Sequence, residues 1–367
     1  MDNAAATPVR KEVLKAMLPY FDKEYGNPSS AHFKGLKARQ AIDDARKKVA
    51  SLICSSPVEI IFTGNGTESV NLAIKGVANA YKQKGKHIIT QKTEHEAVLE
   101  TCKALEREGF EITYLDVDKF GLTDLKKLEA AIRPDTILIT IMYANNEIGT
   151  IQPISEISKI AKSRDVLFHT DACQAGGLLD INVKILGADL MTLNGSKIYG
   201  PKGVGMLYVK SGVKIKPIVY GGGQEFGLRS GTENVAGIVG FAIALTLAQQ
   251  ERIKESKRLT ALRDYFISEL GAKLNGHPKQ RLAGNVNVSI SGIDSDSLIL
   301  QLSDEGICAS TGSACSTGKN EPSHVMRAIG LSEKEARGCV RFSLGRSNTK
   351  ADVDYVLKVL EKKLRNG

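Results

Sequence analysis

Lys197 stands at the end of an apolar run, ADLMTLNGSK (188–197), and before a glycine-rich turn, GPKG (200–203). A lysine at the end of a buried strand can form a Schiff base with an aldehyde cofactor, and a site that lowers the lysine pKa favours this reaction. The competing Lys202 lies inside the turn, where we expect it to be exposed. The pattern favours Lys197 as a covalent attachment point over the alternative of an ordinary surface lysine.

Asp171 lies at the end of a second apolar run, in VLFHTDACQ (166–174). A carboxylate in this position is unfavourable to bury without a cationic partner. A protonated pyridine nitrogen would be such a partner, because the carboxylate would keep the nitrogen protonated and the ring able to accept electrons. Gln174 follows closely and could reach a ring hydroxyl. The residues alone leave open the alternative that Asp171 is a helix N-cap.

The GNGTES stretch (64–69) lies between a strand signal and a helix signal. Its glycines permit a tight turn. The free N–H groups at the helix start, together with the Thr67 hydroxyl, could bind an anion. The motif is weak by itself, and the alternative is an ordinary turn in which Thr67 caps the helix.

Two more polar clusters follow predicted strands. His95 comes after the strand predicted at 86–91 and could stack on a cofactor ring or move protons, although an isolated histidine is often structural. Asn145 and Asn146 follow the strand predicted at 136–143. Their amides could bond a cofactor oxygen or a neighbouring loop.

Cys315 differs from the other cysteines in its surroundings. It lies in ASTGSACSTGKNEPS (309–323), a stretch of small and polar residues, whereas a structural cysteine is usually buried among apolar neighbours. An accessible thiol could act as a nucleophile that reaches a cofactor and then leaves it. We expect structural roles for the other five, which are Cys54, Cys102, Cys173, Cys308 and Cys339.

These side chains need a scaffold that brings several strand ends together. Short apolar runs alternate with helical patterns through the first two-thirds of the chain, which predicts a mainly parallel α/β sheet covered on both faces. Ligands bind at the carboxyl ends of such strands, so we expect the polar clusters to form one site. The predicted strands are 59–63, 86–91, 111–117, 136–143, 166–172, 188–197 and 204–210, of which the last is a candidate antiparallel member.

The pattern changes after about residue 240. A long charged helix, predicted at 237–273, leads into fewer strands and helices that are typical of a smaller α+β domain. We predict a large domain over 13–250. We predict a small domain made of 1–12 and 251–367, which carries the Cys315 loop.

Composition excludes several classes of protein. The chain has 367 residues and a net charge of +9, and its Lys and Arg are interspersed with Asp and Glu, which favours solvated helix faces over a nucleic-acid surface. A basic surface could still favour an acidic protein partner. Apolar runs are too short for a membrane helix, the N-terminus does not read as a secretory signal, and the cysteine spacing does not match a zinc site. We therefore expect a cytoplasmic protein with mostly free thiols and no resident metal.

Taken together, the motifs resemble those of the NifS/IscS-type cysteine desulfurases, which are fold-type I pyridoxal-phosphate enzymes of the class-V aminotransferase family. The resemblance extends over almost the whole chain. The matching stretches are NPSSAH (27–32), GTES (66–69), EH (94–95), ANNEIG (144–149), DACQ (171–174), GSKIYGPKG (195–203), GGGQEFGLRSGTEN (221–234), STGSAC (310–315) and RFSLGR (341–346).

This resemblance implies a role for each residue. Lys197 would hold pyridoxal phosphate as a Schiff base and take the substrate α-proton, and His95 would stack on the ring and manage protons on the substrate thiol. Arg341 would bind the substrate carboxylate, and Cys315 would receive the sulfur as a persulfide. The implied cofactor-binding residues are Gly66, Thr67, Asn146, Asp171, Gln174, Asn194, Gly195, Ser196, Lys197 and Thr232, the last from the other subunit of a homodimer.

The implied activity is removal of sulfur from L-cysteine, giving L-alanine. The sulfur would pass to an acceptor scaffold protein for iron–sulfur cluster assembly or tRNA thiolation, where Cys315 could be a transient cluster ligand. One departure is Ser196, which stands where the family often has His, so phosphate binding would depend more on backbone N–H groups. The alternatives are a selenocysteine lyase, another class-V aminotransferase, or a non-catalytic protein of the same fold that holds RNA.

Overall fold

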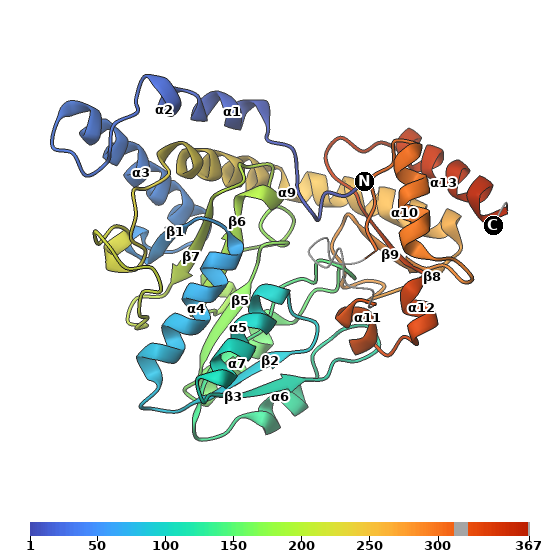
Figure 1. The fold of residues 1–367 in the computed structure, drawn as a ribbon, viewed down its shortest axis with the longest axis horizontal. Helices are drawn as coiled ribbons and strands as arrows, with labels where there is room; N and C mark the ends of the chain where they lie inside the picture. The colour runs from blue at the N-terminus through green and yellow to red at the C-terminus, as the bar shows by residue number, and fades with distance from the viewer. Residues whose placement is uncertain (312–321, 366–367) are drawn as a thin grey trace.

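The computed structural model describes residues 1–311 and 322–365 (Figure 1). Seven strands form one sheet in the order β1-β7-β6-β5-β4-β2-β3, and all neighbours are parallel except β7, which is antiparallel to both β1 and β6. The predicted α/β fold and the antiparallel placement of 204–210 are therefore confirmed. The strands are β1 Ile60–Thr63, β2 His87–Gln91, β3 Glu111–Leu115, β4 Thr136–Thr140, β5 Leu167–Asp171, β6 Leu190–Asn194 and β7 Gly205–Val209.

Successive residues of these strands face two separate cores. On β1, Ile60 and Phe62 belong to one core and Ile61 to the other, as the two-residue period of a strand requires. Helices α3, α7 and α9 cover the first face, and α4 and α5 cover the second. Burial on both faces explains why the strands read as continuous apolar runs. The helices before residue 235 are α1 Lys11–Met17, α2 Pro19–Asp22, α3 Phe33–Leu52, α4 Gly66–Tyr81, α5 Glu96–Arg107, α6 Leu125–Ala131, α7 Ile154–Ser163 and α8 Val183–Leu186.

A second, antiparallel sheet of order β10-β9-β8 has its own core (Figure 1). The long helix α9 runs from one sheet to the other, with Phe241 in the first core of the large sheet and Phe266 in the core of the small one. The chain start also joins the small sheet, where Asp2 pairs in parallel with Ser343. The remaining elements are α9 Val235–Leu270, β8 Lys273–Leu274, β9 Asn285–Ser289, α10 Ser295–Asp304, α11 His324–Ala328, α12 Glu333–Arg337, β10 Cys339–Ser343 and α13 Lys350–Arg365.

The boundaries differ from the predicted ones for local reasons. The strand predicted at 188–197 ends at Asn194, because the next three residues turn as a 3₁₀ helix that Asn194 caps. The helix predicted to end at 273 stops earlier, because Gly271 takes a left-handed conformation (φ 59°). The domain division at residues 12 and 250 stays a prediction, since α9 continues unbroken through the second boundary. Within the described ranges, every helix is too short or too polar to cross a membrane.

Candidate active site

The polar strand ends meet around one cavity of about 220 Å³. It lies at the carboxyl ends of the parallel strands, where an open sheet of this kind binds its ligand. Of the candidates named from sequence, those on its wall are Gly66, Thr67, His95, Asn146, Asp171, Gln174, Asn194, Lys197 and Arg341. Three of the cofactor-binding residues implied by the resemblance do not line it within the described part of the chain, and these are Gly195, Ser196 and Thr232.

Lys197 is placed by the short turn that follows β6. The Asn194 side chain accepts a hydrogen bond from the Ser196 N–H (3.1 Å), which starts the 3₁₀ turn and brings Lys197 back to the cavity. The lysine Nζ donates to the carbonyl of Ala5. Lys202 is exposed, as expected for a residue inside the glycine-rich turn.

Asp171 ends β5 and lies on the cavity wall. Its Oδ1 accepts a hydrogen bond from the backbone N–H of Cys173 (2.9 Å), and the next described helix begins only at Val183, so the N-cap alternative is wrong. Burial and the neighbouring Asp171 carboxylate raise the pKa of the Cys173 thiol well above its usual value. Cys173 therefore stays a neutral thiol, and it lines the cavity although the sequence indicated only a structural role.

The start of α4 provides the anion-binding end of the cavity. Asn65 caps this helix by accepting from the Glu68 N–H (2.9 Å), so the alternative of Thr67 as the cap is wrong. The N–H groups of Gly66 and Thr67 have no acceptor inside the helix and are available to an anion. A side chain at Gly66 would approach the Cys173 Sγ to 2.9 Å, so only glycine lets the helix start lie this close.

His95, Asn145 and Asn146 make different contacts. His95 caps α5, its Nδ1 accepting from the Ala97 N–H (3.0 Å), which leaves Nε2 as the protonated nitrogen of a neutral ring. Asn145 is buried and holds a neighbouring loop, since its Nδ2 donates to the Thr93 carbonyl (2.8 Å). Asn146 lines the cavity.

Arg341 provides a buried positive charge from the small sheet. It lies on β10 and is only 1% exposed. Its guanidinium donates to Asp2 Oδ1 (2.8 Å) and to the Asn146 carbonyl (3.0 Å), while Nε has no hydrogen-bond partner among the described residues. An unpartnered N–H on a buried guanidinium at a cavity wall can bind a ligand carboxylate.

Cys315 lies outside the described residues. The described residues on either side of it contact cavity residues or their immediate neighbours. Ser310 exchanges backbone hydrogen bonds with Arg341, and Ser323 Oγ donates to Glu147 Oε2 (2.6 Å).

The other cysteines only partly match the structural role predicted for them. All five that the structure describes carry free thiols. Cys102 and Cys339 are buried, as a structural cysteine should be. Cys308 is exposed, so the burial expected of a structural cysteine is absent there.

Sequence reasoning missed the chain start and one buried acid. Ala4 and Ala5 line the cavity and bond site residues through their carbonyls. Glu94 is fully buried, its Oε1 accepts from the Met142 N–H (2.7 Å), and burial raises its pKa well above the usual value. The sequence signal for Glu94 was its place directly before His95 at a strand end.

Comparison with known proteins agrees with this geometry. The family model "Aminotransferase class-V" matches residues 1–356. Cysteine desulfurase IscS of Dictyoglomus turgidum is 54% identical and the match covers 99% of this chain and 93% of that protein. Cysteine desulfurase IscS of Methanosarcina thermophila is also 54% identical, over 100% of this chain and 92% of that protein.

Solved structures give the same result. A NifS-like protein superposes with a TM-score of 0.94 at 40% identity and covers 100% of this chain and 99% of its own. SspA in complex with cysteine superposes with a TM-score of 0.84 at 41% identity, and the match covers 94% of this chain and 97% of that one. The chain therefore belongs to the class-V aminotransferase family. Within that family its full-length relatives group it with the cysteine desulfurases, as the motif resemblance predicted.

The enzymes of this family use pyridoxal phosphate, and the cavity fits that cofactor. Lys197 and Asp171 both line the cavity, where the lysine amine would meet the cofactor aldehyde and the carboxylate would meet the pyridinium nitrogen. The start of α4 at Gly66 and Thr67 also lines the cavity, and its N–H groups would receive the phosphate. These three groups match the aldehyde, the ring nitrogen and the phosphate of one molecule.

Proposed function

We propose that the protein removes sulfur from L-cysteine with bound pyridoxal phosphate, releases L-alanine and carries the sulfur on Cys315. The observation that carries the proposal is the convergence of Lys197, Asp171 and Arg341 on one cavity, from three different strands or turns. An amine for the cofactor, a counter-charge for its ring and a cation for an amino-acid carboxylate are the groups that such a reaction needs.

When bound, pyridoxal phosphate supplies an electron sink that stabilises negative charge at the substrate α-carbon. Lys197 takes the α-proton, and Arg341 holds the carboxylate so that this proton faces the lysine. His95, with its protonated Nε2, holds a proton near the substrate thiol.

The sulfur transfer balances without an added oxidant. The Cys315 thiolate attacks the substrate sulfur, so an S–S bond forms while the substrate C–S bond breaks. The electron pair of that C–S bond stays with carbon, which takes up a proton and becomes the methyl group of alanine. The placement of Ser310 and Ser323 beside Arg341 and Glu147 supports this role for the intervening segment.

We also propose that the protein works as a cytoplasmic homodimer that passes sulfur to an acceptor scaffold protein, as for iron–sulfur cluster assembly. Thr232 is exposed and does not line this chain's own cavity, as expected if it serves the partner's cofactor. Several large apolar side chains near the chain start are exposed, which is typical of a covered interface. They are Leu14, Leu18, Phe21, Tyr25, Phe33 and Leu36. Sedimentation of the purified protein as a monomer at micromolar concentration would contradict the dimer.

Product analysis tests the activity. Purified protein loaded with pyridoxal phosphate is incubated with L-cysteine, and alanine, pyruvate and protein-bound persulfide are measured, with Lys197→Ala as the control. We expect alanine and persulfide in equal first-turnover amounts from the wild type and neither from the variant. Turnover of selenocysteine but not of cysteine would identify the selenocysteine lyase instead, and a keto acid product would identify an aminotransferase. RNA binding without turnover would favour the non-catalytic alternative.

A further inference from the structure

The first residues of the chain form part of the cofactor cavity. We call residues 2–10 the N-terminal strap, because this segment crosses from the small sheet to the large one along the cavity wall. The Ala4 carbonyl accepts from Gln174 Nε2 (3.0 Å), and the Ala5 carbonyl accepts from Lys197 Nζ. The strap therefore contacts the proposed cofactor lysine directly.

Thr7 makes the closest set of bonds to the turn that carries Lys197. Its backbone N–H and its Oγ1 both donate to the Ser196 carbonyl (2.9 and 3.0 Å), and the same Oγ1 accepts from the Tyr199 N–H (2.7 Å). The Thr7 hydroxyl thus donates its one proton and accepts with one of its two lone pairs. Thr7 is buried, so water cannot replace these bonds easily. The threonine holds the turn just before and just after Lys197.

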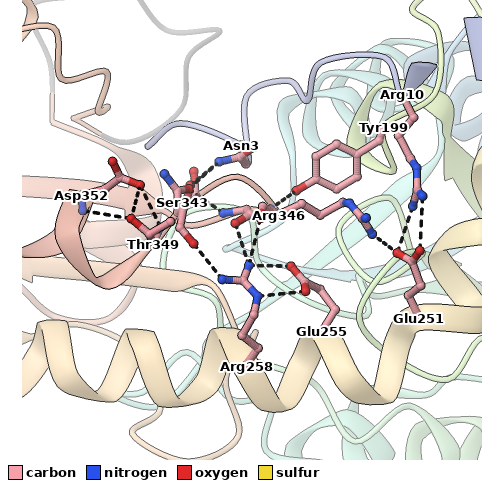
Figure 2. A network of polar contacts seen from close by, with 12 residues as sticks. Asn3, Arg10, Tyr199, Glu251, Glu255, Arg258, Ser343, Arg346, Thr349 and Asp352 are labelled. Atoms are coloured by element: carbon pink, nitrogen blue, oxygen red, sulfur yellow. Dashed lines mark hydrogen bonds and ion pairs between the residues drawn. The ribbon is translucent and has the colours of Figure 1, made fainter. Parts of the chain in front are cut away.

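The backbone at Tyr199 explains why the turn needs to be held. Tyr199 has φ 61°, a left-handed conformation that a residue with a side chain keeps only when its surroundings fix it. Besides the Thr7 bond, its carbonyl accepts from the Arg10 N–H (3.1 Å) and its hydroxyl accepts from the Arg346 N–H (2.8 Å). Figure 2 shows the Tyr199 ring reaching toward Arg346, and shows both arginines meeting at Glu251 of α9. The strap and the segment that follows β10 therefore fix Tyr199 together.

We propose that Thr7 is a positioning residue for Lys197: its hydroxyl fixes the turn at 195–199 so that the lysine amine stays where it can react with the cofactor aldehyde. The inference rests on the proposed function insofar as Lys197 holds the cofactor. A fixed amine reacts at a high effective concentration, and an amine on a loosened turn spends less time in the reactive position. Thr7 itself does not touch the reacting atoms.

The test compares Thr7→Val with Thr7→Ser. Valine keeps the shape of threonine and removes both hydroxyl bonds, whereas serine keeps the hydroxyl. Cofactor-free protein is titrated with pyridoxal phosphate by absorbance, and the Lys197 adduct is counted by borohydride reduction and peptide mass spectrometry. We expect Thr7→Val to bind the cofactor about tenfold more weakly, because two hydrogen bonds that fix the lysine turn are lost. Thr7→Ser should stay within about twofold of the wild type.

Thr136→Val is the matched control for loss of stability. Thr136 Oγ1 also makes two hydrogen bonds, accepting from the Arg133 N–H (2.8 Å) and bonding His87 Nδ1 (2.7 Å), but it lies at the amino end of β4, away from the cavity. We expect it to lower the melting temperature of cofactor-free protein as Thr7→Val does, while cofactor affinity stays unchanged.

Equal cofactor affinity in Thr7→Val and Thr136→Val would overturn the inference. If Thr7→Val does not fold, a tenfold loss of affinity in the folded Thr7→Ser protein, whose hydroxyl is intact, would overturn it as well. The readout requires no cysteine turnover. A chain that shows the Thr7 effect but makes no alanine would refute the proposed function and leave the role of Thr7 standing.

Discussion

Replacing His169 with glutamine should remove an acid sensitivity from the fold. His169 is fully buried in the middle of the large sheet, with Nδ1 2.8 Å from Thr140 Oγ1 on β4 and Nε2 3.0 Å from Thr192 Oγ1 on β6. Burial lowers its pKa to about 4, partly opposed by the nearby Asp171 carboxylate. The neutral ring thus links β5 to β4 and β6, two residues before Asp171 on the same strand. A charged ring would be unfavourable in this buried position.

The size of the effect follows from the pKa difference. In the unfolded chain a histidine has a pKa of about 6.5, so between about pH 6.5 and pH 4 the unfolded state binds more protons than the folded one. The free energy of unfolding therefore falls as the pH falls through this window, and the His169 contribution is complete above it. The whole loss is about 3 kcal/mol, of which about 2 kcal/mol appears between pH 7.5 and pH 5.

The assay is urea unfolding of the wild type and His169→Gln at about pH 7.5 and about pH 5. Other buried groups also respond to pH, because burial raises the pKa of Glu94 and Glu147 and lowers that of His87. Only the difference between the two proteins isolates His169. We expect the stability advantage of the wild type over the variant to shrink by about 2 kcal/mol on acidification. An advantage that stays constant within about 0.5 kcal/mol would refute the reasoning.

Three further substitutions test the site and its support. Asp171→Asn should weaken cofactor binding about 100-fold in an absorbance titration, because the ring nitrogen loses its counter-charge, and unchanged binding would contradict that pairing. Arg341→Ala should raise KM for L-cysteine about 100-fold with a smaller change in kcat, because the hydrogen bonds from the guanidinium to the substrate carboxylate are lost. A loss in kcat alone would contradict a carboxylate-binding role. Arg46→Ala should lower the free energy of unfolding by about 3–5 kcal/mol in urea, because it leaves the buried Glu225 carboxylate, now paired with Arg46 at 2.6 Å, without its cationic partner and with only the Phe62 N–H as a donor. An Arg46→Ala protein as stable as the wild type would show that the pair has no net effect.

The sequence could predict the residues at strand ends because their signals are local. Lys197 and Asp171 each follow an apolar run, and a parallel sheet brings the ends of such runs to one edge. The strand order was not predicted, and it is the adjacency of β5 and β6 in the sheet that places Asp171 close to Lys197 along this edge. Arg341 was different, because it lies in the middle of β10, and only the family resemblance indicated its role.

The parts that sequence reasoning missed depend on contacts between distant segments. Thr7 and Ser196 are 189 residues apart, and Ala5 and Lys197 are 192 apart. The bonds from Ala4 and Ala5 use backbone carbonyls, which every residue has, so residue type carried no signal. Cys173 resembled a structural cysteine because its neighbours in sequence gave no sign that α4 starts beside it.

The most direct test of the central claim is to locate the first sulfur atom after one turnover. Wild type, Cys315→Ser and Cys308→Ser, each loaded with pyridoxal phosphate, are mixed with one equivalent of L-cysteine, alkylated and mapped by peptide mass spectrometry. Cys308 is the matched control, because it is an exposed thiol close by in the chain. We predict one added sulfur on the Cys315 peptide of the wild type and of Cys308→Ser, and none on any peptide of Cys315→Ser, which still binds the cofactor on Lys197. Persulfide on another cysteine, or full alanine production by Cys315→Ser, would contradict the account.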